Sequence, residues 1–131
     1  MNEASKTFFA PQLFIKSGIR NIDFYSKAFG AIELRRWSNK DGSLHVAELS
    51  IDGALFHIHE EVARTNSFSP EKYNATTATI GLFVSDVDRV MNTAIAAGAT
   101  ETSPAQDYDY GYRQGELKDP FGHRWLIEMK I

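Results

Sequence analysis

The chain of 131 residues has the length of one domain, and its 43% hydrophobic and 24% charged residues are typical of a globular protein. It carries 14 Lys and Arg against 17 Asp and Glu, without long runs of either sign, which argues against a basic surface for nucleic acid or anionic lipid. No cysteine is present, so disulfides, thiolate nucleophiles and cysteine-based zinc sites are excluded. Because no apolar stretch is long enough for a membrane span and the first residues lack the apolar core of a signal peptide, we expect a cytoplasmic protein.

The chain contains an internal repeat. Segment 17–22 (SGIRNI) aligns without gaps on segment 85–90 (SDVDRV), and Gly30-Ala31 falls on Gly98-Ala99 in the same alignment. Each copy opens with a short apolar run that is typical of a strand and continues with apolar residues at helical spacing. The sequence therefore predicts two copies of one structural unit.

In the first unit, a strand leads into an amphipathic helix and then into three further strands. Apolar residues recur at helical spacing from Ile19 to Phe29, with Ser17 at the N-cap position and Gly30 where a left-handed residue closes the last turn. Turns with the sequences NKDG and DG separate the later strands. The strands are predicted over residues 13–15, 32–37, 44–51 and 54–59.

The second unit repeats this order less clearly. A helix is predicted over 87–97, with Ser85 as its N-cap and Gly98 at its end. We interpret 104–111, which is rich in Tyr and Asp, as a long loop, and the turn at 119–122 (DPFG) as the link between the last two strands. The strands of this unit are predicted over residues 80–84, 100–103, 112–118 and 124–129.

These elements predict an α+β fold of two tandem βαβββ modules, in which curved mixed sheets enclose a cleft and the helices pack outside it. The modules are expected over about 8–60 and 77–131 of a single domain, joined by a linker over about 61–76. Strand alternation assigns side chains to the two faces of each sheet. The helix side is predicted to receive Phe56, Ile58, Trp125, Ile127 and Met129, and the cleft side Leu55, His57, His59, Arg124, Leu126 and Glu128.

Three motifs are shared with a known superfamily. They are segment 22–30 (IDFYSKAFG), the turn at 85–88 (SDVD) and segment 119–125 (DPFGHRW). Over nearly its whole length, the chain resembles the vicinal oxygen chelate superfamily, which includes glyoxalase I, extradiol dioxygenases, and the bleomycin and fosfomycin resistance proteins. It is most similar to the PhnB-like branch. The resemblance implies paired βαβββ modules of the glyoxalase/bleomycin resistance/dioxygenase fold, usually dimerised, with a ligand cleft formed by the sheets.

The resemblance also implies where a catalytic metal would bind. Enzymes of this superfamily hold a divalent ion through four inward positions, usually His, Glu or Gln, and the ion acts as a Lewis acid. Carried over to this chain, those positions fall on Ala10 or Pro11, on Glu48, on Thr79 and on Leu126. Only Glu48 offers a strong donor, and one carboxylate does not hold a catalytic metal against water. We therefore expect the fold without the usual metal or any other cofactor.

A displaced metal site is the alternative interpretation. Gln12 lies near the vacated first position, and Glu128 lies on the same strand face as the vacated last position. Together with Glu48 and either His57 or His59, they would offer mixed oxygen and nitrogen ligands to a divalent ion. The chain would then be a metal-dependent lyase, isomerase or dioxygenase.

Other side chains are candidates for ligand contact. His57 and His59 share one strand face, which suits a metal or a substrate anion. The aromatic rings of Trp37 and of segment 108–112 would stack on a planar ligand or pack against a partner subunit. The complete set of candidate cleft residues is Gln12, Trp37, Glu48, His57, His59, Tyr110, Tyr112, Arg124, Leu126 and Glu128.

The leading hypothesis is a protein that binds a small apolar or aromatic molecule, without a catalytic metal, in a cleft shared across a homodimer. The metal-dependent enzyme is the second hypothesis. The third is a dimeric interaction module whose cleft is vestigial. None of the three involves nucleic acid or a membrane.

Overall fold

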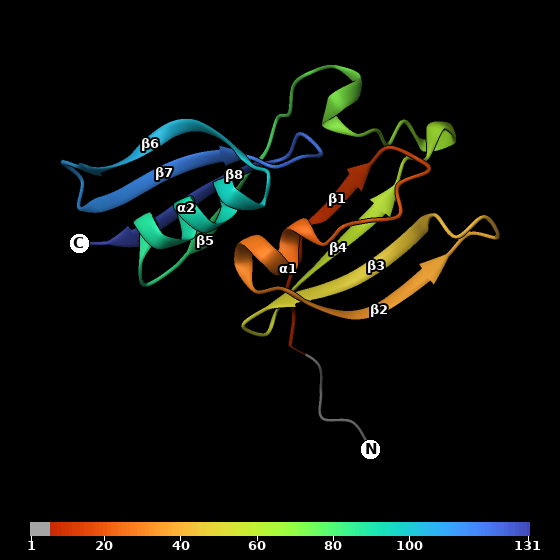
Figure 1. Ribbon diagram of the computed structural model, residues 1–131, viewed down its shortest axis with the longest axis horizontal. Coiled ribbons are helices and arrows are strands. Elements are labelled where there is room, and N and C mark those ends of the chain that lie inside the picture. Colours follow the sequence, from red (N-terminus) through yellow and green to blue (C-terminus); the bar gives the residue numbers. More distant parts are fainter. Residues whose placement is uncertain (1–5) are drawn as a thin grey trace.

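The computed structural model describes residues 6–131, which form two four-stranded mixed sheets with one α-helix each (Figure 1). The strand order is β1-β4-β3-β2 in the first sheet and β5-β8-β7-β6 in the second, so each sheet has a parallel pair at one edge and antiparallel pairs elsewhere. This arrangement confirms the predicted α+β fold of two βαβββ modules. The elements are β1 (Gln12–Ile15), α1 (Phe24–Phe29), β2 (Ile32–Ser38), β3 (Leu44–Ile51), β4 (Ala54–Glu60), β5 (Thr79–Phe83), α2 (Val87–Ala97), β6 (Thr100–Tyr108), β7 (Tyr112–Lys118) and β8 (Arg124–Lys130).

Helix α1 is shorter than the apolar periodicity predicts. It begins at Phe24, with Asp23 as its N-cap, so the prediction of an N-cap at Ser17 is wrong. The backbone carbonyls just before the helix are used elsewhere, because Leu44 N–H donates to the carbonyl of Ile19 at 2.8 Å, and the Arg36 guanidinium to that of Arg20 at 2.8 Å. Segment 17–22 is thereby held against the sheet as irregular backbone rather than as a helical turn.

Helix α2 begins and ends close to its predicted limits. Its N-cap is Asp86, whose carboxylate accepts a hydrogen bond from Arg89 N–H at 3.1 Å, so the cap lies one residue beyond the predicted Ser85. Both helices end at a glycine with positive φ, Gly30 at 69° and Gly98 at 123°. The predicted glycine endings are confirmed at both positions.

Strand β6 continues through most of the segment that was interpreted as a loop. It extends to Tyr108 and includes Pro104. Proline is tolerated there because β6 is an edge strand and its pairing with β7 is irregular, with register shifts on either side of Ser103. The connection to β7 is therefore a short turn at 109–111, and the loop prediction for 104–108 is wrong.

The core lies between the two sheets, on the side where the helices pack. Phe56 of β4 and Trp125 of β8 meet edge to face with ring centroids 5.9 Å apart, and Trp125 also contacts Phe29 of α1 at 4.7 Å. Ile58 and Ile127 are fully buried in the same cluster, and Met129 packs against it, as strand alternation predicts. Because the helix sides of β4 and β8 face each other, the opposite faces, called here the open faces, point away from each other within one chain.

The turn between β7 and β8 joins the modules. In this turn, His123 Nε2 lies 2.8 Å from the carbonyl oxygen of Phe14 in β1. The Tyr25 hydroxyl of α1 donates a hydrogen bond of 2.6 Å to the buried Asp119 carboxylate of the same turn. Hydrogen bonds of this kind, between groups withdrawn from water, hold the two modules in one orientation.

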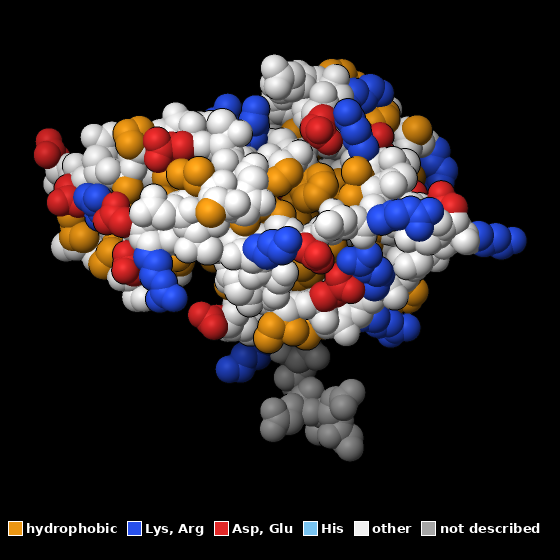
Figure 2. Space-filling view, viewed as in Figure 1, with side chains coloured by type: hydrophobic (Ala, Val, Ile, Leu, Met, Phe, Trp, Pro, Cys, Tyr) orange, Lys and Arg blue, Asp and Glu red, His pale blue; other side chains and the backbone are white. Residues whose placement is uncertain are grey.

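The surface carries both signs of charge. On the face shown in Figure 2, Lys and Arg side chains are interspersed with Asp and Glu, and apolar side chains emerge between them. No helix within residues 6–131 combines the length and the apolar character needed to cross a bilayer.

Candidate ligand-binding site

One polar row crosses the open face of the first sheet. Gln12, His57 and Glu48 are register partners on β1, β4 and β3, so their side chains emerge side by side. His57 Nε2 lies 3.4 Å from a Glu48 carboxylate oxygen, and this nitrogen is buried without a hydrogen-bond partner among the described residues. The row therefore offers an unused ring nitrogen next to a carboxylate.

A second row on the same face is largely aromatic. Phe14, His59 and Trp37 are linked through the register of β1, β4, β3 and β2. The Phe14 and His59 rings are 5.2 Å apart, and His59 Nδ1 contacts the carbonyl of Glu60 at 2.6 Å. The Arg35 guanidinium lies over the Trp37 ring at 4.2 Å. These side chains form an amphipathic surface suited to planar ligands.

On the open face of the second sheet, Arg124 and Leu126 are the candidate residues nearest the start of β8. Arg124 forms an ion pair with Glu116 at 2.6 Å. Leu126 is half-buried beside the register partners Gly81 and Glu116, and offers only carbon. The positive charge of Arg124 is thus already paired within the sheet.

Further along this face, a carboxylate lies among aromatic rings. Glu128 accepts a hydrogen bond from the Gln114 amide at 2.8 Å, and the Tyr110 hydroxyl donates to the other end of the same amide. Tyr110 stacks near Tyr108 at 5.3 Å and contacts Tyr112 at 5.7 Å. Partial desolvation, and then the nearby groups Tyr108 and Glu128, raise the pKa of the Tyr110 hydroxyl above its usual value. The hydroxyl is the donor in its hydrogen bond to the Gln114 amide oxygen.

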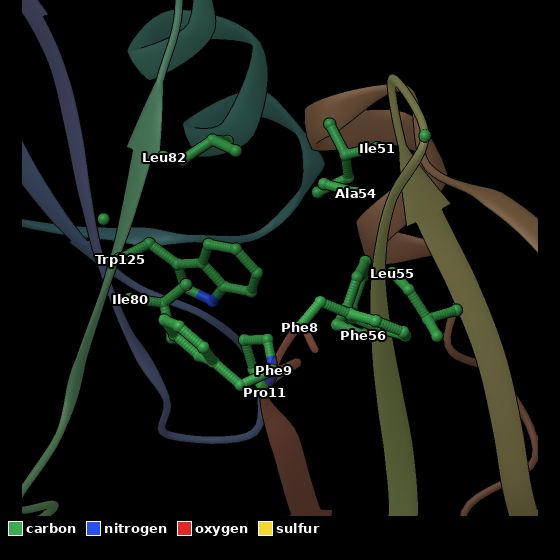
Figure 3. Close-up of a pocket in the computed structure, with 12 residues that line it drawn as sticks. Phe8, Phe9, Pro11, Ile51, Ala54, Leu55, Phe56, Ile80, Leu82 and Trp125 are labelled. Atoms are coloured by element: carbon green, nitrogen blue, oxygen red, sulfur yellow. The ribbon is translucent and has the colours of Figure 1, made fainter. Parts of the chain in front are cut away.

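An apolar crevice of about 580 Å³ separates the modules (Figure 3). Trp125 projects into it from β8 and Phe56 faces it from β4, while Phe8 and Phe9 close it from the segment before β1. Gly81 of the edge strand β5 also lines it. The volume suits a small organic molecule, and the walls are predominantly apolar.

The structure divides the predicted site residues into two groups. Gln12, Trp37, Glu48, His57 and His59 lie on the open face of the first sheet, and Tyr110, Tyr112, Arg124, Leu126 and Glu128 lie on or beside that of the second. Within one chain these faces are turned apart. Gly81, Phe83 and Gln114 were missed as site residues, although the alternation of β5 and β7 places them on the same face as Glu128.

Comparison with known proteins agrees with this architecture. Residues 10–127 match the family model of the Glyoxalase/Bleomycin resistance protein/Dioxygenase superfamily, and the chain belongs to that superfamily. It is 39% identical over 125 residues to the uncharacterized protein Mb0911c of Mycobacterium bovis, an alignment covering 93% of this chain and 82% of that protein.

Two solved structures show the same fold. TioX from a Micromonospora species is 25% identical with a TM-score of 0.70, covering 95% of this chain and 97% of TioX. The fosfomycin resistance protein FosX from Listeria monocytogenes is 16% identical with a TM-score of 0.68, covering 97% of this chain and 95% of that one. The second likeness is one of fold alone.

The metal-binding positions implied by the superfamily do not offer a matching donor set. Pro11 uses its carbonyl to accept from His57 N–H at 3.0 Å, Thr79 is exposed at the start of β5, and Leu126 has no donor atom. Glu48 is the remaining carboxylate. Within residues 6–131, no three His, Asp or Glu side chains of one chain are placed to share an ion. These side chains do not supply the His, Glu or Gln donor set that the resemblance implies for the superfamily's metal.

Proposed function

We propose that this protein is a PhnB-like member of the superfamily that binds a small apolar or aromatic molecule without a catalytic metal, as a cytoplasmic homodimer. The observation that carries the proposal is the aromatic crevice between the modules. The residues expected at two of the superfamily's metal-binding positions, Thr79 and Leu126, offer a single hydroxyl and carbon. Shape and apolar contact then supply most of the binding free energy, and a few polar groups orient the ligand.

The homodimer is part of the proposal because of how the open faces are oriented. Each carries half of the candidate residues, and within one chain the two faces point apart. A second copy that brings its second sheet opposite the first sheet of its partner would close a cleft between them. Exposed apolar side chains that a partner would cover include Phe8, Phe9, Ile32, Leu34 and Phe83.

The neutral fluorescent probe N-phenyl-1-naphthylamine tests the binding function. We expect saturable binding to the purified protein that is unchanged by EDTA. Ala54→Trp, which fills the crevice from an exposed position on its wall, should weaken binding about tenfold, equivalent to about 1.4 kcal/mol. Ala63→Trp is the matched control, because Ala63 is exposed and lies outside the crevice.

The same titration also has an outcome that contradicts the proposal. If the probe does not bind, or if both tryptophan variants bind it equally well, the crevice is not a binding site. The interaction module with a vestigial cleft would then be the better account.

A metal-dependent enzyme is the second candidate, and one observation favours it. Among residues 6–131, His57 Nε2 is buried without a hydrogen-bond partner and lies 3.4 Å from a Glu48 carboxylate oxygen, so the two side chains offer a nitrogen and an oxygen ligand side by side. The predicted fourth ligand, Glu128, lies on the other sheet, so only a second copy would complete the set of Gln12, Glu48, His57 and Glu128.

This candidate makes a separate prediction about metal uptake. If the displaced site exists, the purified protein takes up Zn²⁺, Mn²⁺, Ni²⁺ or Fe²⁺ in equilibrium dialysis, and Glu48→Ala and Glu128→Ala each abolish that uptake. Uptake that both variants leave unchanged contradicts the displaced site.

A further inference from the structure

Glu128 is a buried residue whose carboxylate has no cationic side chain as a partner among the described residues. Its residue is 6% exposed, and among residues 6–131 it forms no ion pair. Lys130 lies on the same strand face but is exposed and makes no such contact. Burying a carboxylate without a compensating positive charge is costly, and most buried carboxylates have a cation or several hydrogen-bond donors.

The neighbouring amide satisfies only one of the two carboxylate oxygens. Gln114 Nε2 donates to Glu128 Oε1 at 2.8 Å, while Gln114 Oε1 accepts from the Tyr110 hydroxyl. The amide is therefore oriented from both ends, with its donor directed at Glu128. Glu128 Oε2 has no hydrogen bond to any described side chain and is the open end of this chain of hydrogen bonds.

Gly81 leaves space at that second oxygen. A β-carbon added at this glycine would lie 2.7 Å from Glu128 Oε2, closer than side chains approach one another. Gly81 also lines the apolar crevice. The carboxylate lies on the open face of the second sheet, while the crevice of Figure 3 opens on the other side of the edge strand β5, where Ile80, Leu82 and Trp125 line it.

Aromatic residues lie on the same open face as this carboxylate. Phe83 is the register partner of Glu128 on β5, and its ring lies 6.1 Å from that of Tyr112 on β7. Tyr110 packs against Tyr112 from the turn. Phe83 and Tyr110 are 60% and 62% exposed, so their ring faces remain accessible. Aromatic faces beside a carboxylate attract organic cations, through the ring quadrupole and the negative charge together.

A second carboxylate on this sheet, that of Glu116, has both a cationic partner and a hydroxyl donor. Glu116, one row away on β7, accepts from Arg124 at 2.6 Å and from the Thr102 hydroxyl at 2.6 Å. The sheet therefore supplies a cation to Glu116 and none to Glu128. Glu116 and Glu128 lie on the same face and differ in whether a cationic side chain is paired with them.

We propose that Glu128, with Phe83, Tyr110 and Tyr112 around it, recognises an organic cation, an amine or quaternary ammonium group carried by the ligand. This inference rests on the proposed function, since the apolar body of the ligand would lie in the cleft that a second copy closes over this open face. It assigns a chemical class to that ligand: an aromatic or apolar molecule with one positive charge.

Two probes of similar shape test the inference in buffer that contains EDTA, which removes divalent ions as competitors. N-methylquinolinium carries a permanent positive charge, and quinoline is neutral at about pH 8. Titrations followed by fluorescence should give at least about tenfold tighter binding of N-methylquinolinium. Glu128→Gln should abolish that preference, while Glu116→Gln, the matched control, should keep it.

Two further measurements keep the test decisive. Gly81→Ala should also weaken binding of N-methylquinolinium, because the added methyl group displaces Glu128 Oε2; this variant replaces Glu128→Gln if the latter fails to fold. Equal affinity of the wild-type protein for both probes, or a preference that survives Glu128→Gln, overturns the inference. If the cation preference is absent but the wild-type protein still binds N-phenyl-1-naphthylamine, the proposed function stands without the cation site. If the wild-type protein binds neither the cationic probe preferentially nor N-phenyl-1-naphthylamine, the proposed function and the inference both fail.

Discussion

Tyr25 of α1 donates a hydrogen bond of 2.6 Å to the carboxylate of Asp119, in the turn between β7 and β8. The same carboxylate accepts from the Trp125 indole at 3.0 Å and from the backbone N–H groups of Phe121 and His123 at 2.9 and 3.0 Å. Asp119 is thus a buried anion held by four donors, one of which comes from the other module. The contact fixes how the two modules pack and hence the shape of the crevice between them.

Removing the Tyr25 hydroxyl should destabilise the protein. Tyr25→Phe leaves the ring packing intact but takes one donor from a buried carboxylate, and we expect the free energy of unfolding to fall by about 1 to 3 kcal/mol. Urea denaturation followed by tryptophan fluorescence measures the change. Tyr73→Phe is the control, because Tyr73 is exposed and should change stability very little. Equal stability of both variants would show that the inter-module hydrogen bond contributes nothing.

The same residue predicts a loss of stability at alkaline pH. Burial, followed by the charge of Asp119 and the hydrogen bond to it, raises the pKa of Tyr25 well above its usual value of 10.0. The folded protein therefore retains a proton that the unfolded chain loses, so this contribution to stability is complete below pH 10 and declines as the pH rises above it. Melting temperatures measured across this range should fall for the wild type and fall less steeply for Tyr25→Phe. Parallel curves would contradict the assignment.

The proposed homodimer can be tested on the open face of the second sheet. We expect the wild-type protein to sediment with twice the 14.7 kDa mass of one chain. Leu126→Glu places a charge at the centre of the open face, where a partner would bury it, and should give a monomer. Ile95→Glu is the control, because Ile95 is partly exposed on α2 and distant from the open faces in the fold. A monomeric wild-type protein would contradict the shared cleft.

Much of the fold could be predicted from local patterns in the sequence. The glycines that end both helices and the alternation of β4 and β8 depend on residues close together in the chain, and the structure confirms them. The two modules were predicted from a direct match between segments 17–22 and 85–90, and the structure confirms two equivalent sheets. The start of α1 could not be predicted, because the carbonyls of Ile19 and Arg20 are engaged by residues from β2 and β3. The extent of β6 was missed because only an edge position makes Pro104 compatible with a strand.

The candidate site was less predictable than the fold. Alternation placed Glu128 on the correct face of β8, but its surroundings come from three other segments, with Phe83 on β5, Gln114 on β7 and Tyr110 in the turn before β7. The orientation of the two open faces could not be predicted from the sequence either, because it depends on the contact between Phe56 and Trp125 across the modules. Contacts between distant segments of this kind leave no periodic signal in the chain.

The metal content of the purified protein tests the central claim most directly. The protein should be expressed in medium supplemented with Zn, Mn, Ni and Fe salts, purified without chelators and analysed by inductively coupled plasma mass spectrometry. Because Thr79 and Leu126, at two of the ligand positions that the resemblance implies, offer no strong donor and Glu48 is a single carboxylate, we predict far less than one tightly held ion per chain. A content of about one transition-metal ion per chain that survives gel filtration would contradict the account.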